Sequence, residues 1–273
     1  MEKKRVLFVS QEIMPFLPKS TISATSRKLP QGVQESGKEI RVFMPRFGVI
    51  NERRHQLHEV IRLSGMNLII DDMDHPLIIK VASIPAARMQ VYFIDNEEYF
   101  KRKAVFSNDK DVEFEDNDER SMFFCRGVLE TVKKLGWQPD IIHCNGWMTS
   151  LMPMYIKDIY KNDPHFADTK VVYSLYESEF NDNWQKKFPE KLKFEGFKDE
   201  IIDLIKEGDF TSLNKAAMQY ADGIVMSSDK VNDELKKSFE ESEGLKMDFE
   251  SEEIQPKLMS EFFDKVIEEE AIV

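Results

Sequence analysis

The stretch Arg5-Val6-Leu7-Phe8-Val9-Ser10 is a short, almost uninterrupted apolar run, and it predicts a buried β-strand near the N-terminus. Seven further runs rich in Val, Ile, Phe and Tyr follow, with turn signals between them, at residues 39–44, 67–70, 77–84, 89–94, 140–144, 170–175 and 223–227. Several of these runs are continuous rather than alternating, which is typical of strands covered by helices on both faces of a parallel sheet.

Helical patterns lie between these strands. Residues 22–36 and 118–135 each place apolar side chains on one side of a helix, and Gly136 ends the second. With a hairpin expected near residues 66–94, the order predicts an α/β fold, a Rossmann-like and mostly parallel sheet with helices on both faces. Ligands of such sheets bind beyond the carboxyl ends of the strands, so a site is expected in those loops.

The composition of the 273 residues limits the class of partner. No apolar run approaches the roughly 20 residues of a membrane span, and the N-terminus lacks the features of a signal peptide. Only two cysteines occur, Cys125 and Cys144, and both are expected in the core of a protein from a reducing compartment. A cytoplasmic protein without a membrane partner is therefore expected. The net charge of −12 argues against a nucleic-acid partner, whereas a neutral sugar polymer meets no such electrostatic penalty.

The loop after the first strand is where a nucleotide phosphate lies in folds of this type, cradled by glycine backbone and a helix N-terminus. This loop contains no glycine, because the first glycine of the chain is Gly32. Lys19 and the hydroxyls of Ser20 and Thr21 remain as candidate donors to a ligand. The simpler alternative is that Ser20 or Thr21 only caps the helix that follows.

Short segments in a fixed order also carry a family resemblance: Val6-Leu7-Phe8-Val9, Pro15-Phe16, Met44-Pro45-Arg46-Phe47-Gly48, Val91-Tyr92-Phe93-Ile94-Asp95, Pro139-Asp140-Ile141-Ile142-His143 and Tyr220-Ala221-Asp222. Over roughly residues 5–230 the chain resembles the N-terminal catalytic domain of bacterial glycogen and starch synthases, the ADP-glucose-dependent glycosyltransferases of family 5. The resemblance implies one half of a GT-B architecture, in which two Rossmann-like domains face a cleft. It also implies transfer of glucose from ADP-glucose to an α-1,4-glucan, with no metal ion or other cofactor.

The chain departs from the family pattern at the motifs that carry the chemistry. Where the family has Lys-Thr-Gly-Gly-Leu, this chain has Pro18-Lys19-Ser20-Thr21-Ile22, so the lysine is shifted by one position and both glycines are replaced. The motif His-Ala-His-Asp-Trp-His-Thr becomes His143-Cys144-Asn145-Gly146-Trp147-Met148-Thr149, and Thr-Val-His-Asn becomes Ser174-Leu175-Tyr176-Glu177. The family's second domain is expected to be missing, so synthase activity is expected to be impaired or absent unless a partner chain supplies that domain.

No residue is a confident catalytic group, but several positions are expected to line a substrate site at the ends of the strands. These candidates are Glu12, Lys19, Ser20, Thr21, His143, Asn145, Trp147, Tyr176 and Glu177. His143 is more often an internally bonded core histidine than a base, and core packing is favoured for Trp147 over stacking on a sugar ring. For Trp184 and Phe188, in the polar segment 181–200, both interpretations stay open.

Two other features have competing interpretations. His55, His58 and Glu59 have a helix-like spacing that resembles a metal-binding face, although a solvated helix is favoured and no metal site is expected. Residues 1–230 are expected to form the Rossmann-like domain and residues 231–273 an acidic helical tail, with charge runs at 250–253 and 268–270. In that tail, an apolar stripe either packs back on the domain or meets a partner protein; its members are Leu258, Phe262, Phe263 and Val266.

The leading hypothesis is therefore a glycogen or starch synthase-like protein of α-glucan metabolism, with α-glucan and ADP-glucose as its expected ligands. Two alternatives compete with it. One is a non-catalytic glucan-binding or regulatory protein that kept the fold and exchanged the reaction centre. The other is an interaction module that docks on a partner through the Phe262/Phe263 stripe.

Overall fold

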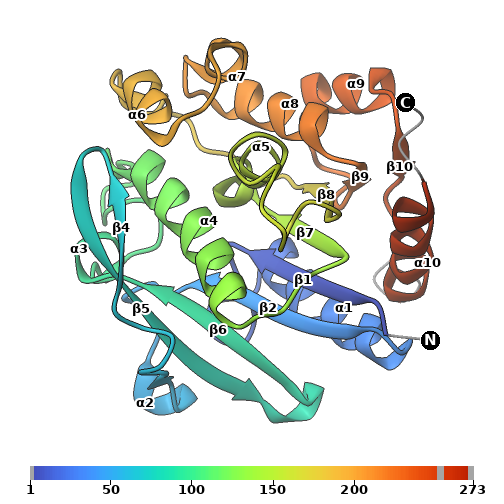
Figure 1. The fold of residues 1–273 in the computed structure, drawn as a ribbon, viewed down its shortest axis with the longest axis horizontal. Coiled ribbons are helices and arrows are strands. Elements are labelled where there is room, and N and C mark those ends of the chain that lie inside the picture. Colours follow the sequence, from blue (N-terminus) through green and yellow to red (C-terminus); the bar gives the residue numbers. More distant parts are fainter. Residues whose placement is uncertain (1–2, 251–254, 270–273) are drawn as a thin grey trace.

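The computed structural model describes residues 3–250 and 255–269. Its centre is one mixed sheet in the order β10-β9-β8-β7-β1-β2-β6-β5-β3 (Figure 1). Strand β4 pairs with the N-terminal part of β5, beyond the part that pairs with β6. The pairs from β10 to β6 are parallel, and β5 pairs antiparallel with β6, β3 and β4. The expected Rossmann-like, mostly parallel sheet and the antiparallel hairpin near residues 66–94 are thus confirmed.

The strands agree closely with the apolar runs of the sequence, because a continuous run of branched and aromatic side chains suits a strand buried on both faces. Their bounds are β1 Arg5–Ser10, β2 Glu39–Pro45, β3 His58–Glu59, β4 Met66–Ile70, β5 Met73–Ile84, β6 Met89–Asp95, β7 Ile141–Asn145, β8 Lys170–Leu175, β9 Gly223–Met226 and β10 Leu245–Met247.

Helices cover both faces of the sheet (Figure 1). On one face, α1 packs along β1 and β2, while α4, α5 and α8 lie over the other face. The helical elements are α1 Thr21–Glu35, α2 Glu52–His55, η1 Pro85–Ala87, α3 Glu97–Phe100, α4 Asn117–Lys134, η2 Trp147–Thr149, α5 Met152–Met154, η3 Tyr155–Ile159, α6 Phe188–Glu195, α7 Asp199–Ile205, α8 Phe210–Tyr220, α9 Asp233–Glu241 and α10 Gln255–Glu268.

The segment 181–200, which has no clean period in the sequence, contains all of α6 and the start of α7 rather than only an irregular flap. Two of its aromatic side chains, Trp184 and Phe188, are buried: Trp184 is 7% exposed and Phe188 is fully covered. The question left open for these two residues is thereby resolved in favour of core packing.

The last helix, α10, packs on the same face as α1. Lys38 donates to Ser260 at 2.8 Å and to Asp264 at 2.8 Å, and a Cβ on Gly32 would lie only 2.4 Å from Pro256. Phe262, Phe263 and Val266 are buried, and Leu258 is half-buried. The apolar stripe therefore packs back on the domain, as the first alternative predicts, and it is not presented to a partner. Residues 251–253 and 270 of the acidic runs lie outside the described residues.

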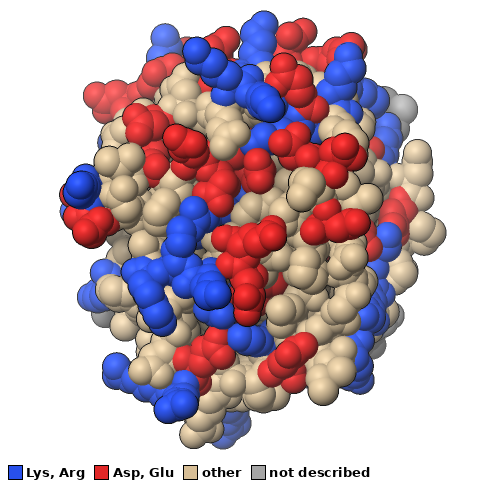
Figure 2. All heavy atoms as spheres, turned by 90° about the vertical axis from the view of Figure 1, so that its left-hand side faces the viewer, with Lys and Arg blue, Asp and Glu red and all other residues tan. Residues whose placement is uncertain are grey.

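The face of the molecule that carries α3, β4 and α6 has acidic and basic side chains interspersed with uncharged surface (Figure 2). Within residues 3–250 and 255–269, no helix combines the length and the apolar character needed to cross a bilayer.

Candidate functional site

The chain order reverses between β1 and β7, and this switch point places three loops side by side. From β1 the chain continues to β2 on one side, while β7, β8 and β9 extend the sheet on the other. Ser10, Asn145 and Ser174 pair across β1, β7 and β8, so the loops that leave these strands start at the same edge. Open α/β sheets bind their ligands at such a point. We call the region the switch-point crevice.

Ser20 begins helix α1 as its N-cap. Its hydroxyl accepts from Ser23 N at 3.0 Å, and Ser23 Oγ accepts from Ser20 N at 2.8 Å, so both residues satisfy backbone N–H groups. This confirms the expectation that Ser20 caps the helix. The same Ser20 hydroxyl donates to Glu12 Oε2 at 2.7 Å. A carboxylate of the chain therefore lies directly at the positive end of α1.

A second carboxylate, that of Glu177 in the loop after β8, lies at the same helix end. Thr21 Oγ1 donates a short hydrogen bond to Glu177 Oε1. Burial raises the pKa of the Glu177 carboxyl, but the Thr21 hydrogen bond, the Ser228 hydroxyl and the charge of Lys230 outweigh burial and hold this pKa below its ordinary value. Glu177 is therefore ionised at neutral pH, and it lies with Glu12 at the start of α1.

Gln11, which the sequence-based candidates did not include, closes the floor of the crevice. Its Nε2 donates to Glu12 Oε1 at 3.1 Å, and its Oε1 accepts from Met148 N at 3.3 Å. Gly146 makes room for it: this residue has φ of +88°, and a Cβ there would lie 2.3 Å from Gln11 Oε1. The only signal in the sequence is the place of Gln11, directly after the first strand.

Three of the predicted site residues form a buried chain beneath the crevice. Tyr176 OH donates to Asn145 Oδ1 at 2.8 Å, and Asn145 Nδ2 lies 3.4 Å from His143 Nδ1. His143 Nε2 is 2.7 Å from Ser174 Oγ, and the ring is wedged between Phe8 and Phe263. Burial lowers the pKa of His143 to about 3, so the imidazole is neutral and acts as a core residue.

Of the two remaining candidates, Lys19 is exposed to solvent and Trp147 is buried. Lys19 is exposed and contacts no polar partner in the part of the chain that the structure describes. Trp147 is 2% exposed and packs against Phe106, Phe180 and Trp184, with ring centroids 4.7, 5.0 and 6.3 Å away. The structure thus joins Glu12, Ser20, Thr21 and Glu177 by hydrogen bonds at the helix end, and Lys19 takes no part in these bonds.

The histidine pair near residue 55 does not form one helical face. Helix α2 ends at His55, Gln56 has a left-handed conformation, and His58 begins β3. The expected solvated helix over all three residues is therefore wrong at its C-terminal half, because the chain turns at Gln56. Among residues 3–250 and 255–269, no group of three or more His, Cys, Asp or Glu side chains could hold a metal ion.

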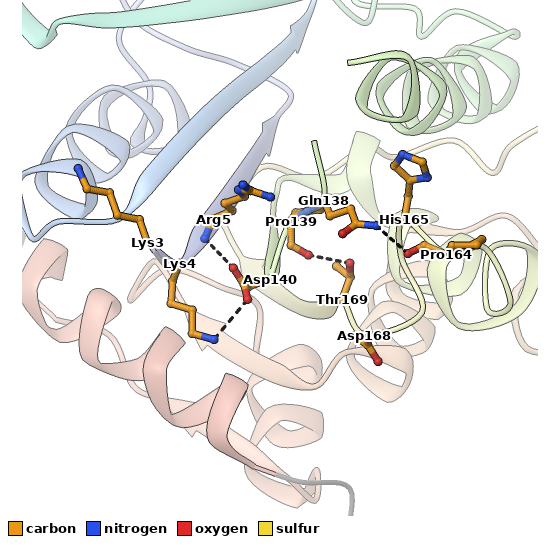
Figure 3. Close-up of a pocket in the computed structure, with 10 residues that line it drawn as sticks. All are labelled: Lys3, Lys4, Arg5, Gln138, Pro139, Asp140, Pro164, His165, Asp168 and Thr169. Atoms are coloured by element: carbon orange, nitrogen blue, oxygen red, sulfur yellow. Dashed lines mark hydrogen bonds and ion pairs between the residues drawn. The ribbon is translucent and has the colours of Figure 1, made fainter. Parts of the chain in front are cut away.

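A cavity of about 260 Å³ lies at the opposite edge of the sheet, where β1, β7 and β8 begin (Figure 3). Its polar groups are engaged with one another: Asp140 accepts from Arg5 N at 2.7 Å and from Lys4 Nζ at 3.4 Å, and Thr169 Oγ1 donates to the carbonyl of Pro139 at 2.8 Å. These bonds tie the starts of the strands together, which is a structural role far from the strand ends that form the crevice.

Comparison with known proteins shows a family to which this chain is similar. A family model described as the starch synthase catalytic domain matches residues 5–251. Glycogen synthase of Chlorobium phaeobacteroides is 34% identical over 247 residues, which are 88% of this chain and 49% of that protein. Glycogen synthase of Chlorobaculum tepidum is 36% identical over 228 residues, covering 83% of this chain and 46% of that protein.

A solved structure shares the fold. The catalytic domain of starch synthase IV from Arabidopsis thaliana, bound to ADP and acarbose, superposes with a TM-score of 0.66 at 17% identity. The match covers 82% of this chain and 45% of that chain. The chain spans about half the length of the curated relatives it matches.

Proposed function

Because the chain belongs to the family of starch synthase catalytic domains, we propose that it serves α-glucan metabolism by binding α-glucan and does not transfer glucose from ADP-glucose on its own. One observation supports this proposal above the others. Glu12 and Glu177 accept hydrogen bonds from the first two hydroxyls of α1, at the place where this class of sheet holds a diphosphate.

Electrostatics makes this arrangement unfavourable for a nucleotide sugar. A helix N-terminus attracts an anion through its partial positive charge and its free N–H groups. Here the side chains of Glu12 and Glu177 already accept hydrogen bonds at that helix end. A further negative charge at about 4 Å from a carboxylate is repelled by roughly 4 kcal/mol at an effective dielectric constant of 20. A neutral hydrogen bond contributes only about 1 kcal/mol, so donors from Ser20 and Thr21 would not compensate.

A neutral polymer of glucose meets none of these penalties. It carries no charge, so neither the two carboxylates nor the net charge of −12 opposes its approach, whereas a nucleic acid is disfavoured. We also assign the protein to the cytoplasm, since Cys125 and Cys144 are buried, free thiols that suit a reducing compartment.

The test is calorimetric titration of the purified chain with maltohexaose and, separately, with ADP-glucose and ADP. We expect heat of binding with maltohexaose and none with either nucleotide at millimolar concentration. An assay with radiolabelled ADP-glucose and glycogen accompanies the titrations, and we expect no incorporation. Tight binding of ADP-glucose, or turnover by the isolated chain, would contradict the proposal.

A second candidate function is glucosyl transfer after a second domain completes the cleft. It is favoured by the curated relatives, which are glycogen synthases about twice as long as the matched region, and by a structural neighbour solved with ADP and acarbose. In this version Lys19 approaches phosphate, and Asn145, Tyr176 and Glu177 line the cleft. Mixing the chain with the C-terminal half of a related synthase tests it, because restored transfer would establish the enzyme and its absence would favour the binding protein.

A further inference from the structure

The side chain of Gln11 lies where the three loops of the switch-point crevice meet. Gln11 directly follows β1, and its backbone N–H donates at 3.1 Å to the carbonyl of Asn145, the last residue of β7. Gln11 is fully buried. Open α/β sheets bind their ligands at this point, beyond the carboxyl ends of the strands. A side chain of the protein therefore fills space at the position where the fold places a ligand.

Each of the three loops supplies the carboxamide of Gln11 with one polar partner. Its Nε2 donates at 3.1 Å to Glu12 Oε1, in the loop after β1, and at 3.4 Å to Ser178 Oγ, in the loop after β8. In the loop after β7, Met148 N donates to Gln11 Oε1 at 3.3 Å. Two groups that accept and one N–H that donates suit a neutral group with both functions, such as a primary amide or a hydroxyl.

Gly146 creates the space that this carboxamide occupies. A Cβ on Gly146 would lie 2.3 Å from Oε1 of Gln11, 2.4 Å from its Cδ and 2.6 Å from its Cγ. A glycine is typical of positions where a ligand approaches the backbone closely. Here the group against the glycine backbone is the carboxamide of Gln11, so the chain itself uses the space.

The partners of this carboxamide also select the kind of group that can replace it. A fully ionised phosphate offers only acceptor oxygens, so it has no proton to donate to the carboxylate of Glu12 and is repelled by it. A neutral amide or hydroxyl can donate to Glu12 and accept from Met148 N, as the side chain of Gln11 does.

We propose that Gln11 is a built-in ligand of the switch-point crevice. Its carboxamide occupies a subsite for a neutral amide or hydroxyl group, formed by Glu12, Met148 and Ser178, and keeps this subsite closed to molecules in solution. Gln11 then closes the crevice together with the carboxylates at the helix end, an assignment that rests on the proposed function.

The test restores the missing group from solution. Gln11→Ala, made in the full chain, empties the subsite, and acetamide is the probe because it reproduces the carboxamide that this variant lacks. Gln11→Met is the matched control, since it fills a similar volume without a hydrogen-bonding amide. N,N-dimethylacetamide is the control probe, because it has no N–H to donate to Glu12. Thermal unfolding and the hydrogen exchange of Met148 N–H are measured for each variant with each probe.

We expect acetamide at about 100 mM to raise the melting temperature of Gln11→Ala by about 2 °C or more relative to the wild type, and to give Gln11→Met no such gain. Met148 N–H should exchange about tenfold faster in Gln11→Ala than in the wild type and slow again with acetamide. N,N-dimethylacetamide should produce neither effect.

No response of Gln11→Ala to acetamide, or an equal response of Gln11→Met, would overturn the subsite and leave Gln11 as a tie between loops. If Gln11→Ala does not fold, Gln11→Ser replaces it, because serine leaves most of the same space empty. The proposed function fails by a different result, namely tight binding of ADP-glucose to the wild-type chain.

Discussion

The switch-point crevice and the cavity of about 640 Å³ that the segments 112–117 and 182–186 line hold their side chains by different means. In the crevice, Ser20 and Thr21 donate to Glu12 and Glu177, so the donors of the helix end are paired within the chain. Beside the cavity, the ring of Trp184 is held by packing against Phe180 and Phe188, and its buried Nε1–H has no acceptor among the described residues. The hydroxyl donors at the helix end are therefore already used by the chain, which leaves them less available to an anionic ligand.

The fold of the chain agrees with its family, whereas the residues at the expected phosphate position differ from the family's. At the position expected to bind a diphosphate, the carboxylates of Glu12 and Glu177 accept hydrogen bonds from the helix end. The following predictions disturb one region at a time, in order of decreasing effect.

The largest effect is expected from Lys191, which supports the wall of the cavity. Its side chain is fully buried and pairs with Asp118 and with Glu119, the latter at 2.6 Å. Lys191→Ala leaves the buried Asp118 without its cation and should lower the free energy of unfolding by about 3–5 kcal/mol. Urea unfolding measures it. Lys193→Ala, on the exposed side of the same helix, is the matched control and should change stability by less than about 0.5 kcal/mol. Equal effects of the two variants would show that the buried network does not hold α6.

The second prediction concerns pH and the floor of the crevice. Burial lowers the pKa of His143 to about 3, against an ordinary value of 6.5. Between these values the unfolded chain binds a proton that the folded chain does not, so stability is full above pH 6.5 and is lost as the pH falls. At pH 4 the loss from this group is about 3 kcal/mol. His143→Gln should flatten the fall in melting temperature between pH 6.5 and 4. His58→Gln, at an exposed position, should keep the wild-type slope.

The third prediction tests the carboxylates of the crevice. The double variant Glu12→Gln/Glu177→Gln removes both negative charges and keeps amide groups of the same shape. We expect binding of ADP to strengthen by about tenfold or more, equivalent to about 1.4 kcal/mol, with maltohexaose affinity unchanged. Calorimetric titration measures both ligands. Glu190→Gln, an exposed position on α6, is the control for net charge. If the control gains as much ADP affinity as the double variant, long-range charge rather than the helix end explains the effect.

The sequence predicts the sheet far better than the contacts within the sites. The strands over residues 5–10 and 170–175 match their apolar runs. A strand buried on both faces is apolar at every position, so the run itself marks the strand. Helix α6 escapes prediction since its stability depends on the distant Asp118, and β10 because it is only three residues long and half-exposed. The capping role of Ser20 follows from local sequence. Its bond to Glu12, and the unpaired indole of Trp184, depend on segments brought together by folding, which one sequence does not reveal.

The smallest effect is expected at Ser20, where capping and the bond to Glu12 can be separated. Ser20→Ala removes both the acceptor for Ser23 N and the donor to Glu12, and should cost about 1 kcal/mol of unfolding free energy. Ser20→Asn keeps a capping oxygen and also offers amide N–H groups to Glu12, so its stability should stay within about 0.5 kcal/mol of the wild type. Ser20→Asp keeps the cap but sets a third carboxylate beside Glu12. If its unfolding free energy, measured in urea at low salt, falls below that of Ser20→Asn and recovers as salt is added, repulsion at the crowded helix end is established. Equal stability of the Asp and Asn variants at every salt concentration would instead mean that the helix end tolerates further negative charge, and the argument against a bound diphosphate would fail with it.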